Sequence, residues 1–358
     1  MSQARLLIVD DSAAVRRLLQ RSLKEHPIEV VGTAASGRDA LAEIERHQPD
    51  AVTLDIEMPG MTGLEALDQI RVRWPKLPVV MVSSLTSHGA EATVEALTRG
   101  ASAYVTKPSA GIDSSGIDKV GGRLARRILA LVAKHKDVPV DGLIPRPAPN
   151  IKHSSAAFCP RPIKAIAISS SVGGPDALRR VLPSLADVRV PIFITQHMPE
   201  RFTARLAEKL TQGGGPMVSE VSEAQPVLDS KAYLAGGGSH LVVKRAGEGY
   251  LAVPSDAPPE NHCKPAADVM LRSLSNVYRE GLLSLVLTGM GQDALEGSRA
   301  IKAKGGLVLA QDEASAVVWG MAGFVTRDGL ADAVIPLSEL GPSVNRIVVR
   351  GRSKGNGR

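Results

Sequence analysis

The sequence predicts an α/β protein of two domains, each built on a parallel sheet with helices on both faces. Its 358 residues exceed what one small core usually organises, which favours two domains. Short apolar segments alternate with amphipathic segments in both halves of the chain, as in parallel sheets connected by helices. Between the halves, residues 137–162 are dense in proline and lack periodicity, so we expect a linker there.

Five apolar segments in the first half predict the strands of one sheet, and the segments between them predict its helices. The strands are expected at Leu6–Val9, Val30–Ala34, Ala51–Leu54, Val79–Val82 and Ala103–Val105. The helices are expected at Ala13–Glu25, Gly37–His47, Gly63–Arg73, Ala90–Thr98 and Ile117–Val132. Because strands and helices alternate, a ligand site should lie beyond the carboxyl ends of the strands.

Polar residues stand at the ends of several of these predicted strands. Asp10 and Asp11 follow the first strand, Asp55 follows the third, and Ser83 and Lys107 end the fourth and fifth. Three carboxylates at one edge repel each other and require a hard cation such as Mg2+. A single acidic residue here would be an ordinary cap or loop residue. The matched set instead indicates a site that takes a phosphoryl group onto a carboxylate.

Residues 5–108 resemble the receiver domain of two-component response regulators. The segments that carry the resemblance are LLIVDDS, LDIEMPGMTG, VMVSSLT and AYVTKP. It implies a flavodoxin-like fold of five parallel strands, phosphorylated on one aspartate with the help of Mg2+. The implied residues are Asp55 as phosphoacceptor, Asp10, Asp11, Asp55 and the carbonyl of Glu57 as the Mg2+ site, Ser83 and Lys107 as phosphate contacts, and Tyr104 as the switch residue.

The second half repeats the alternation and predicts a doubly wound α/β domain. Its expected strands are IKAIAIS, VPIFITQ, KAYLAGGG, HLVVKR, LLSLVLT and GLVLAQ. We therefore divide the chain into a first domain at 1–135, a linker at 136–162, a second domain at 163–348 and a disordered tail at 349–358.

One stretch of the second domain, Ile163–Leu182, combines a buried strand with a glycine-rich turn. The apolar run Ala165–Ile168 leads into serines and glycines, and Pro175 then starts a helix. Such a turn lifts a small polar side chain above the sheet edge and leaves backbone N–H groups free to meet negative charge. This geometry suits a serine nucleophile with an oxyanion site, and it suits a bound phosphate equally well.

Two further strand ends supply the groups that a serine nucleophile needs. His197 follows the strand Pro191–Thr195, and Asp293 follows the strand Leu282–Thr288. An imidazole can take the proton of the serine hydroxyl, while a carboxylate holds the imidazole in the right tautomer. The chain order Ser, His, Asp differs from that of the familiar triad folds, and Ser169 stands where a nucleophile elbow has its first glycine. The common α/β-hydrolase fold is thereby excluded.

Residues 163–348 resemble the catalytic domain of the CheB-type chemotaxis protein-glutamate methylesterase. The matching segments are AIAISSSVGGPDAL, ITQHMP, AGGGSHLVV, NHCKPAADVM and LTGMGQDALEG. The resemblance implies hydrolysis of glutamate γ-methyl esters and deamidation of glutamines on methyl-accepting chemoreceptors, without a cofactor, and a chemotaxis histidine kinase as phosphodonor. The implied residues are Ser171 as nucleophile, His197 as base, Asp293 as its orienter, and Val172, Gly173, Met290 and His262 around the substrate and oxyanion.

Several positions depart from the pattern of this family. Ser169 and Ser170 replace Gly-Ala, Val172 replaces Thr, and Ala294 replaces Gly, while Lys264 and Ala266 replace Arg and Ser. These changes leave open a second interpretation, in which the hydrolase-like domain is inactive and serves as a phosphorylation-controlled binding module. A transcriptional regulator is a third interpretation, which the lack of a helix-turn-helix pattern disfavours.

Composition narrows the remaining choices. The aromatic share of 3% argues against a single-strand nucleic-acid platform, although the formal charge of +6 favours acidic partners. Cys159 and Cys263 are far apart and outside any C-x-x-C, which indicates a reduced cytoplasmic protein without structural zinc. Since no apolar run reaches membrane-spanning length, we expect no membrane insertion.

Overall fold

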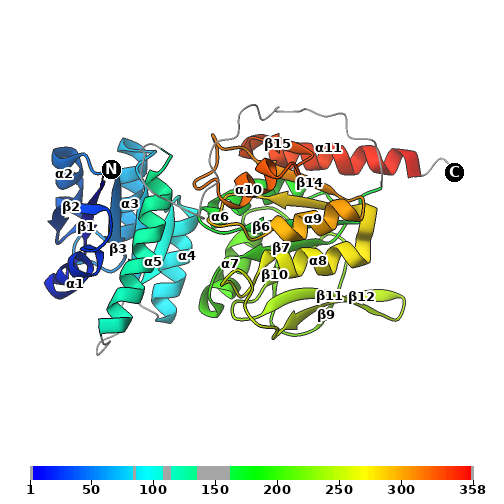
Figure 1. Ribbon diagram of the computed structural model, residues 1–358, viewed down its shortest axis with the longest axis horizontal. Coiled ribbons are helices and arrows are strands. Elements are labelled where there is room, and N and C mark those ends of the chain that lie inside the picture. Colours follow the sequence, from blue (N-terminus) through cyan, green and yellow to red (C-terminus); the bar gives the residue numbers. More distant parts are fainter. Residues whose placement is uncertain (1–2, 84–85, 108–113, 135–161, 356–358) are drawn as a thin grey trace. The chain divides into compact units, whose positions relative to one another are not determined.

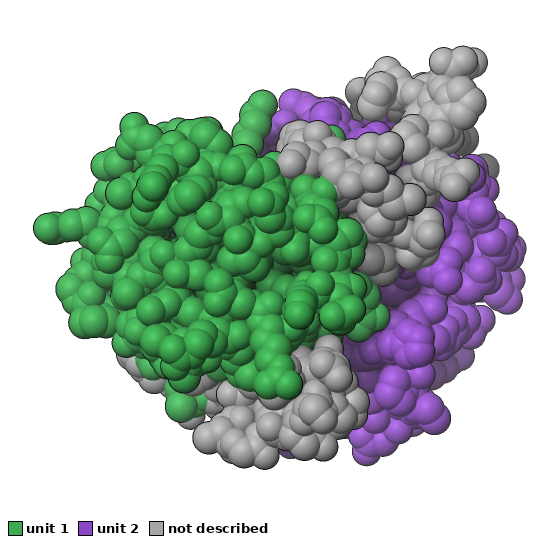
Figure 2. Space-filling view, turned by 60° about the vertical axis from the view of Figure 1, so that its left-hand side comes forward, with its two compact units in different colours: residues 1–141 green, residues 142–358 purple. Residues whose placement is uncertain are grey.

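The computed structural model describes residues 3–83, 86–107, 114–134 and 162–355 (Figure 1). The chain divides into two compact units, Met1–Asp141 and Gly142–Arg358 (Figure 2). The linker predicted at 136–162 lies, apart from Pro162, outside the described residues.

The N-terminal unit is a five-stranded parallel sheet with the strand order β2-β1-β3-β4-β5. Its strands are β1 Ala4–Val9, β2 Ile28–Ala34, β3 Ala51–Asp55, β4 Val79–Ser83 and β5 Ala103–Thr106. Its helices are α1 Ala13–Leu23, α2 Gly37–His47, α3 Gly63–Arg73, α4 Ser87–Thr98 and α5 Ser114–Val132. The predicted fold class of this half is confirmed, and the predicted bounds of α2 and α3 agree with the structure.

Side-chain caps fix the points at which α1 to α4 begin. Each helix is preceded by a serine or threonine in extended conformation whose hydroxyl accepts an N–H of the first turn. At α3 the cap is reciprocal, because Glu65 also accepts the backbone N–H of Thr62 at 2.8 Å. Short capped connections keep the polar residues at the carboxyl ends of the strands close to the sheet.

The C-terminal unit contains a seven-stranded parallel sheet with the order β15-β14-β13-β6-β7-β10-β8. Its strands are β6 Ala165–Ser170, β7 Ile192–Gln196, β8 Met217–Val221, β10 Lys231–Ala235, β13 Leu282–Val286, β14 Leu307–Gln311 and β15 Ala333–Ile335. Its helices are α6 Gly174–Val181, α7 Glu200–Gln212, α8 Ala267–Tyr278, α9 Leu295–Ala303, α10 Met321–Arg327 and α11 Leu337–Gly355. The predicted doubly wound fold is confirmed.

The first strand of this unit, β6, lies between β7 and β13. The chain leaves β6 toward β7 on one side and returns much later to β13 on the other, so the loops that follow these three strands meet at one edge. Residues 165–168 of β6 are fully buried, as expected of a strand covered on both faces. This topology brings the loops of Ser171, His197 and Asp293 next to one another.

The strands β8, β9, β12 and β15 were not expected from the sequence, and two further features contradict the sequence expectation. HLVVKR forms β11 His240–Ala246, which pairs with β12 Gly249–Ser255 and the short β9 Gln225–Pro226 in a separate antiparallel sheet. The disordered tail predicted at 349–358 is wrong up to Gly355, because α11 continues to that residue. Arginine and lysine alternate with small residues at this end, and basic residues favour the C-terminal end of a helix. No described helix is both long and apolar enough to cross a membrane.

Candidate active site

The N-terminal unit gathers its acidic residues at the carboxyl edge of the sheet. Carboxylate oxygens of Asp10, Asp11 and Asp55 lie within 4.8 Å of one another. Asp10 and Asp55 are buried, whereas Asp11 is exposed. The ammonium group of Lys107 lies 3.0 Å from Asp10 Oδ2 and 2.7 Å from Asp55 Oδ2. The structure therefore brings together four of the residues predicted for phosphoryl transfer.

The charge balance of this cluster suits a divalent cation. Burial raises the pKa of Asp55 to about 6, although the hydrogen bond from Lys107 acts in the opposite direction. Among the described residues, Asp10 Oδ2 and Asp55 Oδ2 accept no hydrogen bond beyond their ion pairs with Lys107. Buried, under-satisfied carboxylate oxygens are the ligands that Mg2+ prefers, so the residues fit that ion. The backbone N–H of Glu57 points at Asp55 Oδ1 from 3.4 Å, and the role of its carbonyl stays a prediction.

The two remaining receiver residues lie along the neighbouring strands. Ser83 is buried at the end of β4, where its hydroxyl lies 2.7 Å from that of Thr93 and its carbonyl accepts the N–H of Lys107 at 2.7 Å. Tyr104 on β5 is 8% exposed, and the guanidinium of Arg127 lies 5.2 Å from its ring centre. Burial raises the pKa of Tyr104 to about 12. Their predicted roles in phosphate binding and switching stay predictions.

In the C-terminal unit, backbone hydrogen bonds hold Ser171 between the two neighbouring strand ends. Its N–H donates to the carbonyl of Thr288 beyond β13 at 3.0 Å. Its carbonyl accepts from the side-chain amide of Gln196 at the end of β7 at 2.9 Å. The N–H of His197 in turn donates to the carbonyl of Ser170 at 3.1 Å. The serine loop and the histidine loop are thus joined directly.

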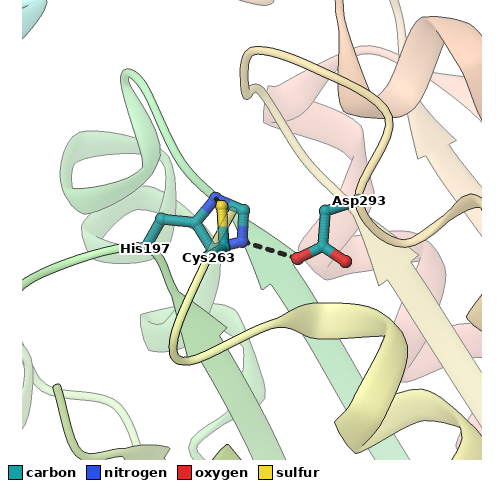
Figure 3. A group of neighbouring side chains, drawn as sticks. All are labelled: His197, Cys263 and Asp293. Carbon is teal, nitrogen blue, oxygen red and sulfur yellow. Dashed lines mark hydrogen bonds and ion pairs between the residues drawn. The ribbon is translucent and has the colours of Figure 1, made fainter. Parts of the chain in front are cut away.

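His197 and Asp293 form a close polar contact at this edge. Nε2 of His197 lies 2.7 Å from Oδ2 of Asp293, which is 2% exposed (Figure 3). Asp293 also accepts the N–H groups of Ala267 at 2.6 Å and Asp268 at 3.0 Å, at the start of α8. The N-terminus of a helix favours a negative charge, so α8 both orients this carboxylate and keeps it ionised.

The contact between His197 and Asp293 shifts the pKa of both side chains. Burial alone would raise the pKa of Asp293, but the hydrogen bond with His197 and the N–H groups of α8 hold that pKa below its ordinary value. Burial alone would lower the pKa of His197, but the hydrogen bonds with Asp293 and Cys263 raise it above its ordinary value. The pair is therefore a carboxylate that binds an imidazole and strengthens it as a base.

The third predicted member of the triad is close in the backbone but is not joined through its side chain. No hydrogen bond connects the hydroxyl of Ser171 to His197 in the described part of the chain. Instead, Nδ1 of His197 lies 3.6 Å from Sγ of Cys263. The assignment of Ser171 as nucleophile stays a prediction.

The turn after Ser171 provides some of the backbone donors that were expected. The N–H groups of Val172 and Gly173 donate to no described residue, whereas that of Gly174 is taken by the carbonyl of Ser171 at 2.9 Å. The N–H of Gly174 is therefore not free to serve an oxyanion. Gly173 has φ 76°, and a Cβ there would lie 2.6 Å from Val317, so only glycine fits.

Within the described residues, no side-chain hydrogen bond or ion pair joins Met290 or His262 to Ser171, His197 or Asp293. Met290 is partly exposed in the loop after β13, and His262 is exposed with φ 60°. Their predicted places near the oxyanion and at the rim stay predictions.

Three residues of this site were not singled out from the sequence. Asn261 donates its side-chain amide to Asp268 Oδ2 at 2.9 Å and to Asp293 Oδ1 at 3.1 Å. Burial and the charge of Asp293 raise the pKa of Asp268 to about 7. Together with Cys263, these residues belong to the segment NHCKPAADVM, whose polar residues were the available signal. Only His262 was chosen from that segment.

Comparison with known proteins identifies both units. The family model "CheB methylesterase" matches residues 166–344, and the model "Response regulator receiver domain" matches residues 6–113. A protein-glutamate methylesterase/protein-glutamine glutaminase of Trichodesmium erythraeum is 41% identical, over 97% of this chain and 99% of its own. The chain belongs to the CheB methylesterase family.

Two further relatives support membership of the CheB family. A protein of the same name from a Nocardioides species is 42% identical, over 98% of this chain and 97% of its own. The solved catalytic domain of the Thermotoga maritima CheB methylesterase is 32% identical with a TM-score of 0.51, over 52% of this chain and 99% of that domain. Both resemblances drawn from the sequence are confirmed at the level of family, and the interpretation as a transcriptional regulator finds no support.

Proposed function

We propose that the chain hydrolyses glutamate γ-methyl esters on methyl-accepting chemoreceptors, releasing methanol, and deamidates selected glutamines of the same receptors. The relatives that share nearly the whole chain carry both activities in their names. The observation that carries the proposal is the imidazole of His197, held 2.7 Å from a buried carboxylate at the sheet edge where Ser171 also lies.

The reaction follows the logic of a serine hydrolase. Ser171 Oγ attacks the side-chain carbonyl of the substrate while His197 takes the hydroxyl proton, and water later releases the acyl group. Because Nε2 of His197 bonds Asp293, the accepting nitrogen is Nδ1. The N–H groups of Val172 and Gly173, with the loop of Met290, are the donors that we assign to the oxyanion.

Asp293 acts through the imidazole. Its two oxygens are fixed by His197, by the N–H groups of Ala267 and Asp268, and by Asn261. This network holds the ring in the tautomer with a hydrogen on Nε2 and stabilises the imidazolium that forms during attack.

We further propose that phosphorylation of Asp55 by a chemotaxis histidine kinase raises the esterase activity. Asp10, Asp11 and Asp55, with the carbonyl of Glu57, would hold Mg2+, which neutralises the charge of the incoming phosphoryl group. Lys107 already contacts both buried carboxylates, and it would pair with the phosphate oxygens once Asp55 is modified. Ser83 would contact the phosphate, and Tyr104 would be the switch residue whose side chain changes conformation on phosphorylation. With the chemoreceptors as substrate and the histidine kinase as phosphodonor, we propose that the reaction takes place in the cytoplasm.

The test is methanol release from a methylated receptor by the full chain, with and without a small phosphodonor and Mg2+. Ser171→Ala should lower the rate on the order of 1,000-fold or more, because no other group replaces the nucleophile. Ser169→Ala is the matched control, since Ser169 is buried in the same segment and its hydroxyl has no hydrogen-bond partner in the part of the chain that the structure describes. Methanol release by Ser171→Ala at the rate of the unmodified chain would contradict the assignment of Ser171 as nucleophile.

A second candidate function is a phosphorylation-controlled binding module with an inactive hydrolase-like domain. The absence of a Ser171–His197 hydrogen bond among the described residues is the observation that favours it. Methanol release by the unmodified chain above the level of Ser171→Ala would exclude this candidate. Receptor binding without any release, in the presence of phosphodonor, would support it instead.

A further inference from the structure

Cys263 gives the candidate active site a ligand type that the esterase reaction does not use. Its sulfur lies 3.6 Å from Nδ1 of His197, and Asp293 bonds the opposite nitrogen of the same ring (Figure 3). The ligand atoms of Cys263, His197 and Asp293 all lie within 4.8 Å of one another. Cys263 and His197 are both partly exposed, so neither side chain is sealed in the core.

The separation of sulfur and nitrogen matches that of two ligands on one tetrahedral zinc ion. With a zinc–sulfur distance of about 2.3 Å and a zinc–nitrogen distance of about 2.0 Å, the tetrahedral angle places the two ligand atoms about 3.5 Å apart. The observed separation is 3.6 Å. The two ligand atoms are therefore separated by the distance that one tetrahedral ion requires.

The second nitrogen of the ring is arranged as in protein zinc sites. Nε2 of His197 donates to a buried carboxylate, which fixes the tautomer and leaves Nδ1, 3.6 Å from the sulfur, without a proton. A carboxylate on the far nitrogen is the usual support of a metal-binding histidine. Asp293 is itself held by the N–H groups of Ala267 and Asp268, so the ring is oriented before any ion binds.

We propose that a thiophilic divalent cation, Zn2+ in particular, binds between Sγ of Cys263 and Nδ1 of His197 and inhibits the esterase. The ion occupies the nitrogen that takes the proton of Ser171, so the bound form has no base. Water fills the remaining positions of the ion, which leaves the site open and the binding reversible. The sulfur and nitrogen ligands discriminate this site from the all-oxygen cluster of Asp10, Asp11 and Asp55, which suits Mg2+. Binding stands on geometry alone, whereas inhibition rests on the proposed function.

Cobalt spectroscopy of the full chain tests binding without any need for activity. Co2+ is added in the presence of excess Mg2+, and the absorption band from thiolate-to-cobalt charge transfer is followed. The chain has two cysteines, so Cys159→Ser provides a matched control. We expect a band that saturates at about one ion per chain in the unmodified protein and in Cys159→Ser, and no band in Cys263→Ser or Cys263→Ala. A band that persists without Cys263, or no band in the unmodified protein, would overturn the proposal.

Zinc inhibition of methanol release tests the second part of the proposal, that the bound ion inhibits the esterase. Each variant is compared with its own rate in the absence of Zn2+, and circular dichroism verifies that it is folded. The unmodified chain and Cys159→Ser should be inhibited at the same Zn2+ concentration, and Cys263→Ser should need at least a tenfold higher one. Equal inhibition of Cys263→Ser, or unchanged turnover when the cobalt band is saturated, would contradict inhibition at this site. A chain that releases no methanol but still shows the cobalt band would contradict the proposed function and leave the metal site supported.

Discussion

Replacement of Asp55 by asparagine should stabilise the N-terminal unit at neutral pH in the absence of Mg2+. Asp55 is 1% exposed, and burial raises its pKa from 3.8 to about 6 despite the contact with Lys107. Between pH 3.8 and about pH 6, Asp55 is protonated in the folded chain and ionised in the unfolded chain. Stability therefore falls as the pH rises through this window, and the loss is complete above pH 6.

The size of the effect follows from the same two pKa values. A tenfold change in proton affinity corresponds to about 1.4 kcal/mol, so the charged carboxylate costs about 3 kcal/mol of unfolding free energy at pH 7. Asparagine resembles the protonated acid in shape and charge. The free-energy difference between Asp55→Asn and the unmodified chain should accordingly be near its maximum at pH 7 and close to zero at pH 4.

Hydrogen exchange of the full chain, followed by mass spectrometry, measures this difference in the N-terminal unit alone. Amides of β3 and β1 should exchange on the order of 100-fold more slowly in Asp55→Asn at pH 7, after correction for the intrinsic rate. Mg2+ should slow exchange in the unmodified chain and much less in the variant, because the ion stabilises the charged carboxylate. Asp39→Asn, on the exposed start of α2, is the control and should change little. Faster exchange of β3 in Asp55→Asn at pH 7 would refute the reasoning.

Two further predictions concern the base of the esterase. Because Asp293 raises the pKa of His197, methanol release should increase with pH through a midpoint above the ordinary histidine value of about 6.5. Asp293→Asn should shift that midpoint to lower pH and reduce the maximal rate on the order of 1,000-fold or more, and a midpoint that stays in place would contradict the electrostatic coupling. Asn261→Ala removes hydrogen bonds to two buried carboxylates, each worth about 1.5–3 kcal/mol, and should lower kcat about 10- to 100-fold with little change in KM. Asn276→Ala, on the exposed side of α8, is its control, and an equal fall in both variants would show a general effect on α8.

The parts of the fold that follow from periodicity were predictable, and the parts that depend on long-range pairing were not. Strand and helix alternation predicted both parallel sheets, and the bounds of α2 and α3 agree because a capping residue marks each start. HLVVKR reads as a strand from its sequence alone, but nothing in it specifies pairing with β12 in a separate sheet. The helical end of α11 was missed because three glycines near the terminus resemble a disordered tail.

In the candidate site, the residues on strand ends could be predicted and those on the loop before α8 could not. Ser171, His197 and Asp293 each follow a strand of a parallel sheet, and general rules place such residues at one edge. Asn261 and Cys263 lie in a segment without periodicity, where Asn261 and His262 both take left-handed backbone conformations. Their contacts depend on how this segment crosses the loop of Asp293, which local sequence does not encode.

That loop, residues 260–266, gives the site a chemistry that the sheet alone would not provide. The strands supply the serine, the histidine and the aspartate, but the start of α8 fixes the aspartate and Asn261 ties it to Asp268. The same loop places Cys263 on the one imidazole nitrogen that Asp293 leaves open. Residues outside the proposed triad therefore support the carboxylate that strengthens the base, and one of them gives the imidazole its proposed access to metal ions. A substitution at 263 can change the sensitivity of the site to Zn2+ while Ser171, His197 and Asp293 stay as they are.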